Sequence, residues 1–190
     1  MFFLRTTLVS SFTLVALAAA SGVSATELNF IPQASEFAVA AQEYRTIWQT
    51  EGERTVSALQ RATSLRLEQG PIQAIVYEGV SYSGYHERPM RLRASYPSAT
   101  KRATLVHELS HRLISDIAPE NVDQHPVIFL FVYDVWMELW GKEFADEQVV
   151  VESARRGLYD YESAWRDALS LGAAGRNDRW EKLRGEWQKR

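Results

Sequence analysis

The segment HPVIFLFVYDVWMELWG, residues 125–141, limits what this chain can fold into more than any other stretch. Its interior is apolar on every side except at Asp134 and Glu138. A helix that is apolar all round is buried, and about fifteen residues are short for a bilayer, which needs about 20. We therefore expect a buried helix inside a globular fold, whose two carboxylates are costly unless a metal or another cation balances them.

The hydrophobic periodicity predicts a mostly helical α+β fold with a small antiparallel β-sheet ahead of the helix that carries the motif HELSH. Apolar residues at helical spacing predict one long helix over 33–68, or two helices with a break near Gly52. The remaining predicted elements are strands within 72–84 and 90–97 and helices over 98–117, 123–141, 143–157, 160–171 and 177–188.

Residues 1–25 have the pattern of an export signal. A short basic start ends at Arg5, an apolar run follows, and VSA ends at Ala25 with the small residues that signal peptidase requires. We expect cleavage before Thr26, a single domain over 26–190, no stable membrane span after signal removal, and a location in a bacterial periplasm or outside the cell. An uncleaved anchor is the alternative.

Composition excludes some chemistry and some partners. The chain has no cysteine, so any metal must be held by histidines and carboxylates. Its formal net charge is −3, and there is no basic stripe to neutralise phosphates, which argues against a nucleic-acid partner.

The stretch ATLVHELSHRL contains His107-Glu108-x-x-His111. Positions i and i+4 of a helix lie on one face, so the two imidazoles can reach one ion. Glu108 lies about 100° round the helix from His107, beside the ion, where it can hold a water molecule. The spacing predicts a Zn²⁺ site.

HELSH in its apolar frame, preceded by strands and followed by a second helix with two carboxylates, resembles the zincin metallopeptidases, and among them the thermolysin-like gluzincins. The resemblance covers about residues 72–141, and HELSH is its only fully matching motif. In that family the second helix supplies a glutamate ligand and, four residues on, an aspartate that orients the first histidine. Here the order is reversed, with Asp134 before Glu138.

The third ligand has three candidates. If the two helices form an antiparallel hairpin, Asp134 lies opposite His111 and Glu138 lies opposite His107. Asp134 is then the expected ligand and Glu138 the acceptor of a hydrogen bond from His107, although the longer reach of Glu138 could reverse these roles. His125 is the remaining candidate, and it would reach the ion only if the intervening loop folds back.

The resemblance implies a reaction. Zinc lowers the pKa of its bound water and polarises a carbonyl, and Glu108 would take the proton from that water and deliver it to the leaving amine. Candidates for stabilising the oxyanion are His86, Tyr85, Tyr159 and Tyr161. Residues 90–97 would form the strand along which an extended peptide pairs.

The expected function is that of an exported zinc-dependent peptidase that acts on peptides or proteins. The alternative is a catalytically silent, exported zinc-binding protein with a structural or partner-binding role. A third reading is a helical partner-binding protein without a metal.

Overall fold

The structure is a computed structural model, and it describes residues 26–85, 88–119 and 121–189. It confirms the fold class, which is α+β and mostly helical with a small sheet ahead of the motif helix. The predicted export signal, residues 1–25, lies outside the described residues. No helix within the described ranges is long and apolar enough to span a membrane.

Three strands form the sheet, in the order β1 (Glu27–Pro32), β2 (Pro71–Tyr77) and β3 (Met90–Arg93). Both pairs are parallel, so the expected antiparallel sheet is wrong. Sequence reasoning also missed β1, which pairs with β2 along its whole length. A parallel pair needs a crossover between its strands, and the long helix between β1 and β2 provides it.

That helix, α1 (Ala38–Thr63), follows a single 3-10 turn, η1 (Ser35–Phe37), and is unbroken. Of the two predicted alternatives, the single long helix is therefore the one that forms, and there is no break near Gly52. A Cβ atom at residue 52 would lie 2.8 Å from the indole of Trp48. The glycine therefore allows close packing of the indole within a continuous helix.

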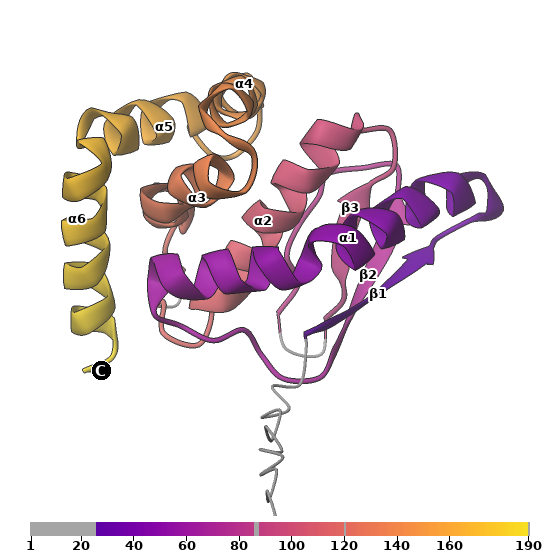
Figure 1. Cartoon of the computed structure of the whole chain (residues 1–190), viewed down its shortest axis with the longest axis horizontal. Coiled ribbons are helices and arrows are strands. Elements are labelled where there is room, and N and C mark those ends of the chain that lie inside the picture. The colour runs from indigo at the N-terminus through magenta and orange to yellow at the C-terminus, as the bar shows by residue number, and fades with distance from the viewer. Residues whose placement is uncertain (1–25, 86–87, 120, 190) are drawn as a thin grey trace, which may run out of the picture.

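The apolar segment forms α3 (His125–Trp140), whose residues are mostly buried, as predicted. It packs against α1 and against the motif helix, α2 (Ser98–Ile114). Three further helices, α4 (Lys142–Ser153), α5 (Tyr161–Ser170) and α6 (Gly172–Trp187), also pack on α3; α4 and α5 lie above it in the view of Figure 1, and α6 lies on its side away from the sheet.

Aromatic side chains join α3 to the C-terminal helices. Trp136 on α3, Trp165 on α5 and Trp180 on α6 are fully buried. Trp165 stacks on Phe129 with a centroid distance of 3.8 Å and an interplanar angle of 11°. Buried aromatic rings contribute much of the apolar area of a core, so this cluster fixes α5 against the N-terminal half of α3.

Candidate metal centre

The two histidines of the motif converge, as their spacing on α2 predicts. His107 and His111 are 1% and 8% exposed, and their Nε2 atoms lie 3.2 Å apart. Two nitrogens held by one tetrahedral zinc ion at about 2.0–2.1 Å are roughly 3.3 Å apart. The separation in the structure therefore suits two ligands of one ion.

His125 completes the cluster. It is the first residue of α3 and is buried. Its ring centroid lies 4.8 Å from that of His111 and 5.4 Å from that of His107. One ring nitrogen from each histidine lies within 4.8 Å of those of the other two. This buried group of three histidines could hold a metal ion.

Each histidine has an oxygen acceptor within hydrogen-bond distance of its Nδ1 atom. The three pairs are His107 with Glu152 (2.9 Å), His111 with Gln124 (2.8 Å) and His125 with Asp123 (2.7 Å). Carboxylate and amide oxygens accept, so Nδ1 carries the hydrogen and the Nε2 lone pair of a neutral imidazole is left free. The Nε2 lone pairs of His107 and His111 lie close together, which is favourable when both bind the same cation.

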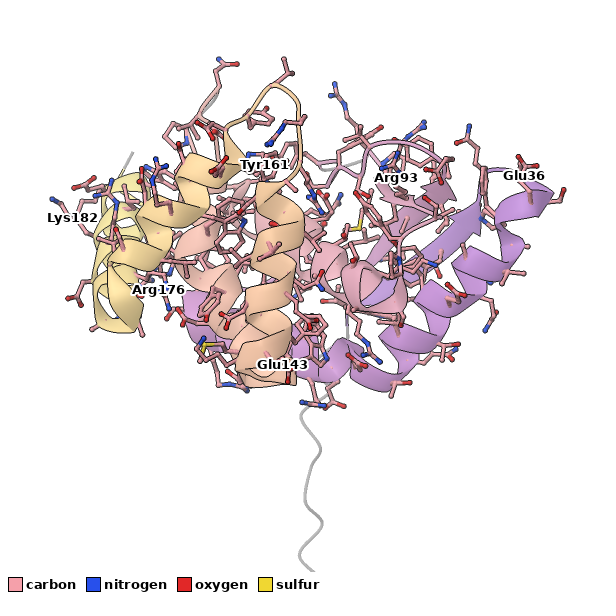
Figure 2. The ribbon with its side chains drawn as sticks, turned by 90° about the horizontal axis from the view of Figure 1, so that it is seen from above. Glu36, Arg93, Glu143, Tyr161, Arg176 and Lys182 are labelled. Carbon is pink, nitrogen blue, oxygen red and sulfur yellow. The ribbon has the colours of Figure 1, made fainter. Side chains whose placement is uncertain are left out.

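Asp134, the expected third ligand, is not at this cluster. Arg176 of α6 binds its carboxylate through two contacts, Nη2 to Oδ1 at 2.6 Å and Nε to Oδ2 at 3.0 Å. Figure 2 shows Arg176 at the α6 side of the molecule, away from Tyr161, whose ring lies against the histidines. The loop before α3 folds back so that His125 faces the motif, and Asp134 lies nine residues further, about 13 Å along the helix axis.

Glu138 is not at the cluster either, because it forms an ion pair with Arg61 of α1. The expectation that it accepts a hydrogen bond from His107 is wrong, and Glu152 of α4 has that role. The expectation that both carboxylates of α3 are buried and need a cation is wrong, because the side chains of Asp134 and Glu138 are 35% and 46% exposed. Each carboxylate does pair with an arginine on a neighbouring helix.

Glu152 is a site residue that sequence reasoning missed, since no spacing links it to the motif 45 residues earlier. Its carboxylate also accepts a hydrogen bond from Trp165 Nε1 (3.2 Å) and lies 3.4 Å from the guanidinium of Arg155. Burial raises the pKa of Glu152, but electrostatic interaction with His107 and Arg155 and the hydrogen bonds from His107 and Trp165 outweigh it and hold the pKa below its ordinary value. An ionised Glu152 keeps the hydrogen of His107 on Nδ1.

Glu108 lies next to His107 in sequence and is 3% exposed. Among the described residues, no hydrogen bond to its carboxyl group is formed. Burial raises the pKa of Glu108 from 4.5 to about 7, and electrostatic interaction with His107 and Arg155 opposes the rise. A carboxyl group with a pKa near neutrality can both accept and release a proton at physiological pH.

Two of the four oxyanion candidates lie against the histidines. The rings of Tyr159 and Tyr161 each have their centroid 4.5 Å from that of His125. Burial raises the pKa of Tyr161 to about 12, so its hydroxyl is a neutral donor near pH 7. Tyr85 instead donates to Gln124 Oε1 (2.9 Å), the acceptor of His111. His86 lies outside the described residues.

The outer edge of β3, expected to pair with a peptide, is already paired by the chain itself. Tyr82 and Arg91 exchange two backbone hydrogen bonds, of 3.0 and 2.8 Å. The backbone N–H of Arg93 donates to Ser81 Oγ at 3.0 Å. A substrate strand would have to displace residues 81–82 to bind along this edge.

Comparisons with known proteins return no matching family, no similar curated protein and no similar solved structure. Only the geometry of the site therefore bears on function.

Proposed function

We propose that this chain is an exported zinc-dependent peptidase, in which His107, His111 and His125 are the metal ligands and Glu108 is the general base. The observation that carries the proposal is the orientation of the three imidazoles. Each has its Nδ1 atom held by an oxygen acceptor, and the remaining nitrogens converge beside a buried carboxyl group with no described hydrogen-bond partner.

The ligand set favours zinc. Imidazole suits zinc, copper, iron and nickel, and an exported protein without cysteine offers no thiolate alternative. Three protein ligands leave one coordination position open, which is the arrangement of catalytic rather than structural zinc sites. When bound, zinc would lower the pKa of a water molecule and polarise a substrate carbonyl.

The chain's own residues would move the proton. Glu108, with a pKa of about 7, would take a proton from the attacking water as the oxygen bonds to the carbonyl carbon. It would then give that proton to the nitrogen of the leaving amine as the carbon–nitrogen bond breaks. The neutral hydroxyl of Tyr161 is the best-placed donor to the negative oxygen that forms on the carbonyl.

The proposal keeps part of the gluzincin resemblance. The two motif histidines and Glu108 have the roles that the resemblance implies. The third ligand differs, because an imidazole from the first turn of α3 replaces the expected carboxylate. The export signal predicted for residues 1–25 is part of the proposal and places the enzyme in a bacterial periplasm or outside the cell.

A catalytically silent zinc-binding protein is the second candidate, and the burial of the ligands favours it. The three histidines are 1–8% exposed, and the rings of Tyr159 and Tyr161 pack on His125. A peptidase must admit a peptide bond to this cluster, so these tyrosines would have to move. A structural site would need no such movement.

Comparing Glu108→Gln with the original chain separates the two candidates. Both proteins are loaded with zinc, their metal content is measured, and hydrolysis of unfolded casein is followed. We expect Glu108→Gln to keep its zinc and to lose activity by about 10²–10⁴-fold, the usual contribution of a general base. Glu147→Gln, an exposed change on α4, is the matched control and should retain activity. Equal hydrolysis by Glu108→Gln, or no hydrolysis by the original chain, would refute the peptidase proposal.

A further inference from the structure

Arg155 lies just after α4, next to the candidate metal centre, and neither the sequence argument nor the proposed mechanism uses it. Its side chain is 20% exposed. The guanidinium carbon lies 5.7 Å from the ring centroid of Tyr161 and 6.0 Å from that of Tyr96. Aromatic faces at such distances attract a cation, so two rings from different parts of the chain hold the guanidinium in place.

The guanidinium is not saturated by carboxylates. Within the described part of the chain, Glu152 is its one ion-pair partner, at 3.4 Å. That contact is longer than a charge-assisted hydrogen bond, which is about 2.7–2.9 Å, and Glu152 lies closer to His107 than to Arg155. A guanidinium has five N–H donors in a planar fork that matches a carboxylate, so donors remain for a further anion.

Beside Arg155 is a surface cavity of about 310 Å³, lined by residues 155–162. Its wall includes Tyr159 and Tyr161, the same rings that pack on His125. Figure 2 places Tyr161 next to the loop between α4 and α5. Tyr159 and Tyr161 therefore contact both the cavity and the histidine cluster.

The acidic residues of this cavity do not neutralise Arg155. The carboxylate of Asp160 accepts a hydrogen bond from the backbone N–H of Ser163 and caps α5. Glu162 is exposed in the first turn of α5. Neither carboxylate forms an ion pair with Arg155 among the contacts of the described residues.

We propose that Arg155 binds a carboxylate of the substrate and so directs the site to peptides or acylated amino acids with a carboxylate near the cleaved bond. This inference rests on the proposed function, because it names the substrate class of the same site. Arg155 is a specificity-determining residue here and takes no part in the proton transfers. The carboxylate can be the C-terminal group of the substrate or an acidic side chain.

Calorimetric titration of the zinc-loaded chain tests the proposal with three probes. N-acetylphenylalanine has a C-terminal carboxylate, N-acetylphenylalaninamide has none, and N-acetylaspartic acid amide has only a side-chain carboxylate. We expect at least one of the two carboxylates to bind tenfold or more tightly than the uncharged amide. The tighter of the two identifies which carboxylate the site takes.

Variants at neighbouring positions provide the controls. Arg155→Gln should remove the preference for the carboxylate probe over the uncharged amide. Arg155→Lys keeps the charge beside Glu152 but not the planar fork, so it should retain that preference only in part. Arg156→Gln, one residue further on the same cavity wall, should keep it. Thermal unfolding checks that each variant is folded, and the lysine variant still decides the matter if the glutamine variant does not fold.

Three outcomes would overturn the inference. The first is equal binding of all three probes. The second is full preference in both Arg155 variants, which would place the carboxylate on the metal itself. The third is equal loss in Arg155→Gln and Arg156→Gln, which would indicate a general charge effect. Binding is measured without turnover, so the two proposals can fail separately. If the chain shows the Arg155-dependent preference but hydrolyses no peptide, the peptidase proposal is refuted and the carboxylate-binding proposal stands.

Discussion

Glu152 of α4 accepts a hydrogen bond from Nδ1 of His107 on α2, and both side chains are almost completely buried. The contact fixes the tautomer and the orientation of the imidazole, because only the Nδ1–H form can donate to the carboxylate. It also links the C-terminal helices to the motif helix. A site that sequence reasoning placed on two helices is therefore built from three.

Replacing Glu152 tests this link. Glu152→Gln removes the negative charge that orients His107 but leaves the side-chain volume almost unchanged. We expect zinc affinity to fall by about 10–100-fold, as is typical when the hydrogen-bond partner of a ligand histidine is lost. Competition with a chromophoric chelator measures the affinity. Glu147→Gln, on the exposed side of the same helix, should bind zinc as the original chain does, and equal affinity in both variants would contradict the assigned role.

The identity of the third ligand is tested by two substitutions on α3. His125→Ala should lose most of the zinc affinity, because it removes one of three ligand nitrogens. Asp134→Asn should leave zinc affinity within about twofold, since Asp134 binds Arg176 instead. If His125→Ala binds stoichiometric zinc and Asp134→Asn loses zinc, the third ligand is Asp134, as first expected from the sequence, and not His125.

Asp134→Asn should instead affect stability. Its partner Arg176 has a side chain only 4% exposed, so the change leaves a buried guanidinium without its ionic partner. Asp134 is itself 35% exposed, and solvent screening reduces the loss to about 1–3 kcal/mol. Urea unfolding measures it. Glu138→Gln breaks the exposed pair with Arg61 and should cost at most about 0.5 kcal/mol; similar losses in both variants would contradict this account.

Glu108 should make the stability of the metal-free protein depend on pH. Burial raises its pKa from 4.5 to about 7 in the folded state, although His107 and Arg155 oppose the rise. A carboxyl group with a higher pKa when folded favours folding in its protonated form, so its contribution is full below about pH 4.5 and declines as the pH rises through about 7.

The expected result is a loss of roughly 2–3 kcal/mol in the free energy of unfolding between pH 5 and pH 8, attributable to Glu108. Urea unfolding in the presence of a chelator measures it in the original chain and in Glu108→Gln. The variant removes the titrating group, so the difference between the two pH profiles isolates its contribution. Parallel profiles would show that Glu108 has an ordinary pKa.

Sequence reasoning correctly located the buried helix and the paired histidines, because both follow from periodicity along one helix. A helix over residues 125–141 is apolar on nearly all sides and must be buried whatever packs against it. Positions 107 and 111 share a face in any α-helix. Asp134 does pair with a cation, but its side chain is 35% exposed, so burial does not require the pair. The identity of that cation as an arginine on α6 was not predictable, because it depends on packing between distant helices.

The errors in the third ligand, the sheet and Glu152 have one common physical cause. Loops and packing between helices decide which elements lie side by side, and periodicity within one element does not reveal this. The loop before α3 places His125 against α2, and this moves Asp134 away by more than two helical turns. β2 and β3 are parallel because the connection between them returns the chain to the same end of the sheet, and β1 was overlooked because its single short alternating run lies next to the predicted signal. Glu152 belongs to the site because α4 packs on α2, and periodicity within α4 contains no sign of that contact.

X-ray absorption at the zinc edge tests the central claim most directly, on the zinc-loaded chain and on His125→Ala at measured stoichiometry. The account predicts one zinc ion per chain with three imidazole nitrogens at about 2.0 Å and one further light atom. It predicts one imidazole fewer in the variant. A chain that binds no stoichiometric zinc, or whose zinc has fewer than three imidazole ligands and is unchanged by His125→Ala, would contradict it.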